Sequence, residues 1–115
     1  APAATVEFLL KNEERFRRQG VFRLDRLLTN PARGASDLAS RRAAYHAALR
    51  GLGPGVHQII LHPAVLSPEL RAATASAVQR DLDYRIFSDP GTVKLMADLG
   101  IQLVGWRDVA PPGGL

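Results

Sequence analysis

Hydrophobic residues form two continuous runs, one near the middle of the chain and one near its end. Residues 56–62, VHQIILH, and residues 101–106, IQLVGW, have the length and the apolar content typical of buried strands. A long stretch with helical periodicity separates them. Two apolar strands joined in this way suit a parallel crossover unit, whose sheet is covered on both faces.

Four other segments repeat their apolar residues at the spacing of a helix. The first and the last of them stop at glycines, Gly20 and Gly100, and the third begins with the capping pair Ser67 and Pro68. Residues 21–29 fit either a short strand or a packed loop. The four predicted helices cover residues 5–19, 37–52, 67–87 and 88–100.

The order of these elements predicts an α/β protein. Residues 1–109 are expected to form a single unit, followed by a flexible tail at 110–115. Two or three strands cannot close a barrel, and they leave open edges. We therefore expect a partial (β/α) barrel or a parallel-sheet fragment, with helices covering two or three parallel strands. Such a fragment would pair with the missing half of a barrel or self-associate.

The composition is that of an ordinary soluble domain. The chain has 115 residues, of which 46% are hydrophobic and 23% are charged. No apolar run reaches the roughly 20 residues that span a bilayer, and the amino terminus does not resemble a secretion signal. Because there is no cysteine, disulfides, thiolate zinc sites and cysteine nucleophiles are excluded. We expect no membrane association and a cytoplasmic location.

The formal net charge is +4, and one cluster of arginines stands out. Such a cluster can bind phosphate backbones. However, it has neither the interleaved aromatic residues of single-strand binders nor a recognised nucleic-acid motif. A solvated helix face is the more economical interpretation, so nucleic acid is an unlikely partner. The cluster consists of Arg15, Arg17, Arg18, Arg23 and Arg26.

The three histidines differ in their predicted positions. His46 lies on a predicted helix and should be exposed. His57 begins the first predicted strand, and His62 ends it on the opposite face. Ligands of α/β folds bind beyond the carboxyl ends of parallel strands. His62 is therefore the candidate catalytic residue, and the alternative is a strand-end histidine bonded to a nearby backbone group.

A second candidate lies on the predicted helix 67–87. Arg80 and Asp83 are three residues apart and can pair on its surface. No metal-binding spacing of histidines and acids is visible, so no metal ligand is predicted in this chain. The nucleophile elbow, the P-loop and the dinucleotide fingerprint are also missing.

At these residues the sequence resembles the carboxyl-terminal half of the YdjC-like carbohydrate deacetylases. LRGLGPGVHQIILHPAV is similar to the family's turn and apolar strand ending in His-Pro-Gly. RDLDY and FSDPGTVKLMADLGIQLVGWRDV resemble its arginine-to-acid helix and closing segment, and FRRQGVFRLDRLL resembles a segment upstream. The resemblance covers roughly residues 8–109. Here the motif reads His-Pro-Ala, with Ala64 in place of the usual glycine.

The resemblance implies a distorted (β/α) barrel that removes acetyl groups from N-acetylated sugars. The family uses a divalent metal, zinc or magnesium, whose ligands lie in the amino-terminal half and match nothing in this chain. His62 aligns with the active-site histidine, whose role would be to protonate the leaving amine. Arg80 and Asp83 would bind the substrate or orient His62. The chain by itself is then expected to be inactive.

Two other functions stay open. The chain could be a non-catalytic binding or interaction module that retains the half-barrel fold. The arginine cluster could also serve a nucleic-acid-binding domain, although it lacks a motif. The resemblance favours the carboxyl-terminal part of a deacetylase.

Overall fold

A computed structural model describes the backbone of residues 3–109 and the side chains of residues 4, 7 and 11–109. The chain divides into two compact units. The smaller contains the residues up to Arg23 and those from Leu103 onward, and the larger contains Leu24–Gln102. The predicted tail at 110–115 lies outside the described residues. The single unit over residues 1–109 stays a prediction.

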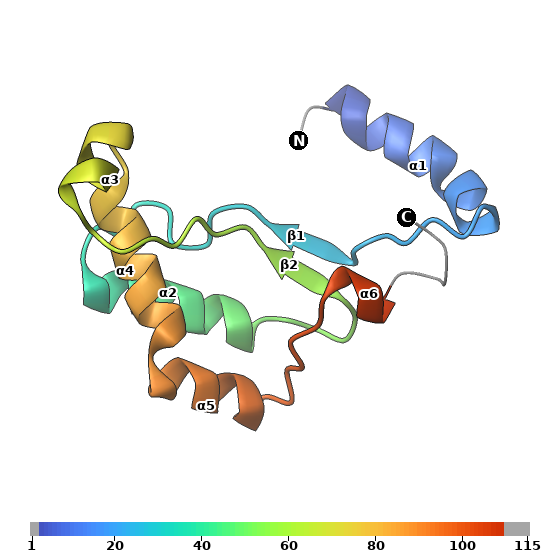
Figure 1. The fold of residues 1–115 in the computed structure, drawn as a ribbon. Helices are drawn as coiled ribbons and strands as arrows, with labels where there is room; N and C mark the ends of the chain where they lie inside the picture. Colours follow the sequence, from blue (N-terminus) through green and yellow to red (C-terminus); the bar gives the residue numbers. More distant parts are fainter. Residues whose placement is uncertain (1–2, 110–115) are drawn as a thin grey trace. The chain divides into compact units, whose positions relative to one another are not determined.

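Two parallel strands joined by a helix form the centre of the larger unit. β1 (Arg26–Leu28) pairs with β2 (His57–Ile59), in a register that sets Leu28 beside Ile59. The connection between them is α2 (Leu38–Arg50), which lies along one side of the pair in Figure 1. The α/β class is therefore confirmed, and residues 21–29 contain a short strand; the parallel crossover joins this strand to β2, and not residues 56–62 to residues 101–106 as predicted.

Asp25 fastens the start of this parallel pair. Its backbone N–H donates to the Val56 carbonyl at 2.8 Å, and its side chain accepts from the Val56 N–H at 2.7 Å. Gly55 has a φ of 124°, which L side chains rarely adopt, and a Cβ there would collide with the Asp25 carboxylate. At the other end, the Ile60 N–H donates to the Leu28 carbonyl at 3.0 Å.

Capping side chains begin three helices where the sequence predicts them. Asp37 accepts a hydrogen bond of 2.8 Å from a backbone N–H in the first turn of α2, and this bond lowers the pKa of the Asp37 carboxyl. Ser67 and Asp89 cap α3 (Pro68–Ala73) and α5 (Pro90–Asp98) in the same way.

The single helix predicted over 67–87 is wrong, because the segment forms two helices. α3 ends at Ala73, and α4 (Ala77–Ser88) begins after a break. Thr74 is extended, with φ −153°, and its hydroxyl accepts the Ser76 N–H at 3.2 Å. Short polar side chains bind the neighbouring backbone in competition with the helical ladder. The chain therefore leaves the helical path at Thr74, and α4 begins as a separate helix at Ala77.

The strand predicted at 101–106 is also wrong. The Ile101 N–H donates back to the Met96 carbonyl at 2.9 Å, which closes α5 with a Schellman turn. The backbone that follows is irregular, Leu103 is 79% exposed, and α6 (Trp106–Val109) begins instead. An apolar run becomes a strand only when it pairs with another strand, and no such pairing forms here among the described residues. The parallel unit forms between β1 and β2 instead.

The core of the larger unit lies between α2, α4 and the sheet. Tyr45 and Ile86 are 2% and 1% exposed, and Ala32 is fully buried against them. Phe87 packs edge-on against the Tyr45 ring, with the ring centroids 5.0 Å apart. Ile59 of β2 packs on this cluster. The core thus holds α4 against α2 near the sheet.

The smaller unit contains α1 (Ala3–Arg18) and α6. Phe22 packs edge-on against Trp106, with the ring centroids 5.8 Å apart. Arg23 lies 3.3 Å from the Glu13 carboxylate. No helix in the described part of the chain is long and apolar enough to cross a membrane.

Candidate functional site

Both strands of the larger unit lead into one small cavity, which we term the carboxyl-end pocket. Thr29 and Asn30 follow β1, and Leu61 and His62 follow β2. α4 crosses near this end of the strands (Figure 1) and contributes the opposite wall. The volume is about 210 Å³. The lining residues are Thr29, Asn30, Arg41, Tyr45, Ile60, Leu61, His62, Ser76, Gln79, Arg80 and Asp83.

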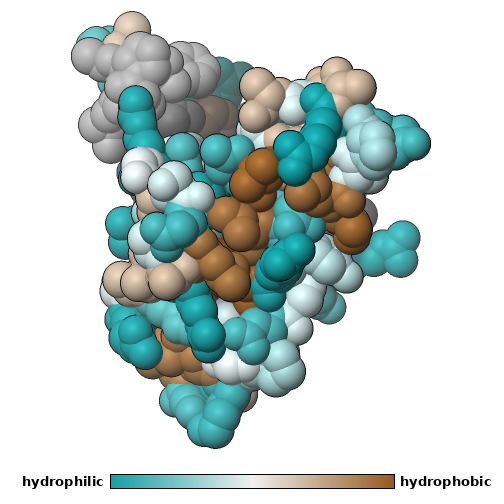
Figure 2. All heavy atoms as spheres, turned by 90° about the vertical axis from the view of Figure 1, so that its left-hand side faces the viewer, coloured by the Kyte–Doolittle hydropathy of each residue, from teal (hydrophilic) through white to brown (hydrophobic). Residues whose placement is uncertain are grey.

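Figure 2 shows the side of the molecule on which the strands end. Hydrophobic residues gather near the centre of this face, and hydrophilic residues surround them. Val65, in the loop after β2, and Val78, on α4, are 63% and 41% exposed. Neither residue lines the carboxyl-end pocket.

All three residues selected from the sequence line the carboxyl-end pocket. His62 comes from the segment after β2, and Arg80 and Asp83 come from α4. The Ala64 N–H donates to the Arg80 carbonyl at 3.1 Å, so the loop after His62 is tied to the helix. The fold therefore brings together residues that are up to 21 positions apart in the chain.

Asp83 has a different partner from the one the sequence suggests. Its carboxylate is buried and binds Arg41 of α2, with nitrogen–oxygen distances of 2.8, 3.0 and 3.1 Å. Arg41 is 7% exposed and also donates to the Ala35 carbonyl at 2.9 Å. The expected surface pair between Arg80 and Asp83 is wrong, since a buried, bidentate partner across two helices holds the carboxylate.

Tyr45 completes this buried group. Burial, together with the hydrogen bond and the negative charge of Asp83, raises the pKa of Tyr45 to about 12. The Arg41 guanidinium opposes the rise, and its Nη2 lies 3.5 Å from the Tyr45 hydroxyl. Tyr45 therefore stays neutral at physiological pH and acts as a hydrogen-bonding wall of the pocket.

Arg80 and Gln79 present the polar groups that are left without protein partners. The Arg80 Nε donates to the Ser76 hydroxyl at 2.9 Å, but its two terminal nitrogens have no partner among the described residues. The Gln79 side-chain oxygen is buried and accepts no hydrogen bond there either. Both residues line the pocket and are half-buried. A ligand in the pocket could pair with the two terminal nitrogens of Arg80.

His57 is the first residue of β2, whereas His62 lies three residues beyond the end of β2 rather than at its last position as predicted, and the two differ in their surroundings. His62 is exposed and makes no side-chain hydrogen bond within residues 11–109, so the backbone bond of the alternative interpretation is not formed there. His57 Nε2 lies 2.8 Å from the Gly53 carbonyl, which makes that nitrogen the donor. The His57 Nδ1 is buried without a partner. His57 is thus half-buried and bonded to the turn before β2, whereas His62 is exposed at the pocket.

His46 is half-buried rather than exposed as expected. Its Nε2 lies 2.8 Å from the hydroxyl of Thr92, which is fully buried. Burial, aided by the charges of Arg42 and Arg50, lowers the pKa of His46, while Asp89 opposes the change. His46 joins α2 to α5 and does not line the carboxyl-end pocket.

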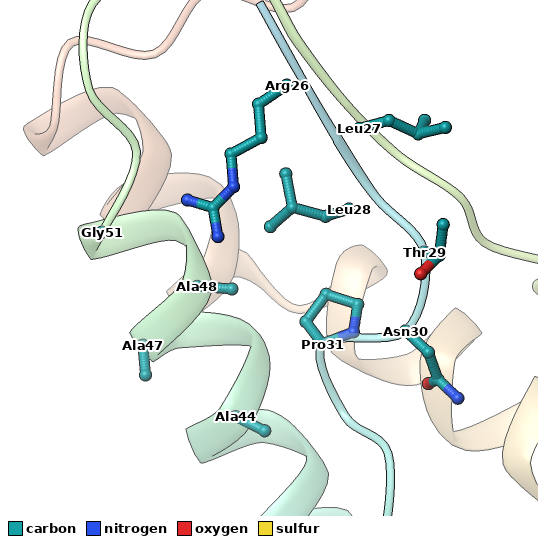
Figure 3. A pocket seen from close by; sticks show the side chains of 10 residues that line it. All are labelled: Arg26, Leu27, Leu28, Thr29, Asn30, Pro31, Ala44, Ala47, Ala48 and Gly51. Atoms are coloured by element: carbon teal, nitrogen blue, oxygen red, sulfur yellow. The ribbon is translucent and has the colours of Figure 1, made fainter. Parts of the chain in front are cut away.

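A second and larger cavity, the β1–α2 groove, has a volume of about 580 Å³. Figure 3 shows Arg26 and Leu28 extending from β1 toward the alanines of α2, with Pro31 at one end. Arg26 is its one ionisable lining residue. The groove can hold apolar groups, but it offers no acid or base. It is lined by Arg26, Leu27, Leu28, Thr29, Asn30, Pro31, Ala44, Ala47, Ala48 and Gly51.

The arginine cluster is partly neutralised by acids of α1. Arg17 and Arg18 lie 3.4 Å from Glu13 and Glu14 respectively, and Arg23 also contacts Glu13. All these groups are partly or fully exposed, so each pair contributes little to stability. Their arrangement is that of a solvated helix face.

The described residues contain no group of three or more histidines, cysteines, aspartates and glutamates that could hold a metal ion. They therefore do not fit a divalent metal by themselves. No protein-family model, curated protein or solved structure matches the chain.

Sequence reasoning missed Arg41 and Gln79. Arg41 stands three residues after Leu38 and four before Tyr45, so it lies on the apolar face of its helix. A charge at such a position signals a buried partner, and this signal was present. Gln79 carries no comparable signal, because its buried oxygen depends on how α4 packs.

Proposed function

We propose that this chain is the carboxyl-terminal part of a metal-dependent deacetylase that acts on N-acetylated sugars, with the larger unit as part of a (β/α) barrel. One observation carries the proposal. His62, Arg80 and Asp83, selected from the sequence, line one cavity at the carboxyl ends of two parallel strands. This is the edge at which α/β enzymes bind ligands and place catalytic groups.

His62 is proposed as the general acid. Cleavage of the amide C–N bond leaves an amine, which departs readily only when it receives a proton. An imidazole can donate a proton near neutral pH, and His62 is exposed at the pocket without a competing side-chain partner among the described residues. The loop after it is tied to α4, so the ring is carried on a fixed segment.

Arg80 is proposed to bind the sugar. Asp83 supports the pocket through Arg41 and does not itself orient His62, because its carboxylate is already engaged. The divalent metal, zinc or magnesium, would bind outside the described residues, in the missing amino-terminal half. The β1–α2 groove and the outer edge of β1 supply a surface where that half could continue the sheet. A cysteine-free chain is compatible with a cytoplasmic location.

An amine-release assay tests this proposal. The protein that combines this chain with the missing half should release free amine from N-acetylglucosamine oligomers when zinc or magnesium is present. The 115-residue chain alone should not. Robust metal-dependent turnover by the chain alone would contradict the proposal, and so would the absence of amine release from the combined protein.

A non-catalytic interaction module is the second candidate. The β1–α2 groove favours it, because the groove is larger than the carboxyl-end pocket and contains no acid–base group. Under this alternative His62 has no catalytic role, so replacing it would change local stability and nothing else.

A further inference from the structure

The positive and negative charges that line the carboxyl-end pocket do not cancel. Arg41 and Asp83 form a closed pair, since the remaining Arg41 donors contact the Ala35 carbonyl and the Tyr45 hydroxyl. Arg80 then remains as a positive charge with no carboxylate partner among the described residues. Apart from His62, the pocket lining therefore carries one excess positive charge.

The nearest acid in sequence is already engaged. The Asp81 carboxylate accepts the Leu66 N–H at 3.0 Å and binds the Arg85 Nε at 2.9 Å. Asp81 is buried and does not line the pocket. It therefore holds the loop after β2 in place and leaves Arg80 uncompensated.

The guanidinium of Arg80 is held in position for a ligand. Its Nε donates to the Ser76 hydroxyl, which in turn lies 3.0 Å from the Thr74 hydroxyl. The two terminal nitrogens remain, and together they match the two oxygens of a carboxylate. Because Arg80 is half-buried, salt screens such a contact less than it screens a surface pair.

The cavity of about 210 Å³ is smaller than the ~300–1,000 Å³ usual for drug-sized ligands, so it suits a single ring. We infer that the carboxyl-end pocket binds an acidic sugar, whose carboxylate pairs with Arg80. The sugar class rests on the proposed deacetylase function, whereas the preference for a carboxylate does not.

NMR chemical-shift titrations of the 115-residue chain with D-glucuronate and D-glucose test the inference. Glucuronate should bind at least about tenfold more tightly, the size of one charge-assisted hydrogen bond, and should shift amides at 29–30, 60–62 and 76–83. Arg80→Gln should remove this preference, and Arg80→Lys should retain part of it. Arg71→Gln, which removes an exposed arginine outside the pocket, should change affinity by no more than about twofold.

Equal binding of the two sugars would overturn the inference, as would an undiminished preference in a folded Arg80→Gln chain. Tighter binding of glucose 6-phosphate than of glucuronate would overturn the assignment to a carboxylate. The deacetylase proposal is tested separately, with N-acetylmuramic acid and N-acetylglucosamine as substrates of the combined protein. Glucuronate binding without amine release from either substrate would refute the proposed function alone. Equal amine release from both would count against the acidic-sugar preference alone.

Discussion

Arg41 of α2 and Asp83 of α4 form a buried ion pair with a shortest nitrogen–oxygen distance of 2.8 Å, and their side chains are 8% and 10% exposed. The pair is 42 residues apart in sequence and joins the two helices behind the carboxyl-end pocket. It neutralises the one carboxylate in the pocket lining. The charge left for a ligand is therefore that of Arg80.

Breaking the Arg41–Asp83 pair should be strongly destabilising. Asp83→Leu leaves the buried Arg41 charge without a partner, and Arg41→Met does the same to the Asp83 carboxylate. Removing one partner of a buried ion pair typically lowers the free energy of unfolding by about 3–5 kcal/mol. The double variant should lose much less than the two single losses together. Urea unfolding measures all three free energies of unfolding. Losses that are small, or strictly additive, would show that the two side chains do not depend on each other.

Gly55 should tolerate no side chain. Gly55→Ala should lower the free energy of unfolding by more than about 1 kcal/mol, because φ is positive there and the new Cβ meets the Asp25 carboxylate. Gly53→Ala is the matched control, since nothing lies within 4 Å of its added Cβ, and it should cost no more than about 0.5 kcal/mol. Thermal or urea unfolding of both variants decides the point. Equal losses would mean that the turn does not set the start of β2.

The lowered pKa of His46 predicts that the folded protein loses stability in mild acid. In the folded protein its pKa lies below the ordinary 6.5, so the unfolded chain binds the proton more readily. The contribution of His46 to the free energy of unfolding is complete above pH 6.5. It declines as the pH falls below that value and levels off once the pH is below the pKa of His46 in the folded protein. His46→Gln can keep the contact with Thr92 but does not titrate. Between about pH 7.5 and about pH 5 the wild type should lose more stability than this variant; an equal loss would contradict the assignment.

Local signals predicted the helices and the strand at 56–62 because caps, glycine stops and side-chain periodicity act within a few residues. The same kind of signal failed at 101–106, where an apolar run has no neighbouring strand among the described residues. It also failed at Thr74, whose hydroxyl interrupts a pattern that reads as one helix. Strand pairing and helix breaks depend on partners that periodicity does not specify.

The sequence predicted the part of the candidate site that depends only on the order and direction of the strands. His62 follows a parallel strand, and such strands end at the same edge, so the sequence could place it beside a pocket. The partner of Asp83 was not predictable from the spacing to Arg80, because packing of α2 against α4 brings Arg41 closer to the carboxylate. The unpaired charge of Arg80 follows from the Arg41–Asp83 pairing, so the sequence alone could not predict it.

Proton donation by His62, in the segment after β2, is tested by measuring kcat of the combined protein. His62→Ala should lower kcat by about a hundred- to ten-thousand-fold with little change in KM, because a general acid acts in the transition state. His57→Ala, at the first residue of β2, should lower stability more than turnover, since His57 bonds the Gly53 carbonyl and does not line the pocket. If the two variants stayed folded and lowered kcat equally, His62 would have no special catalytic role and the account would be wrong.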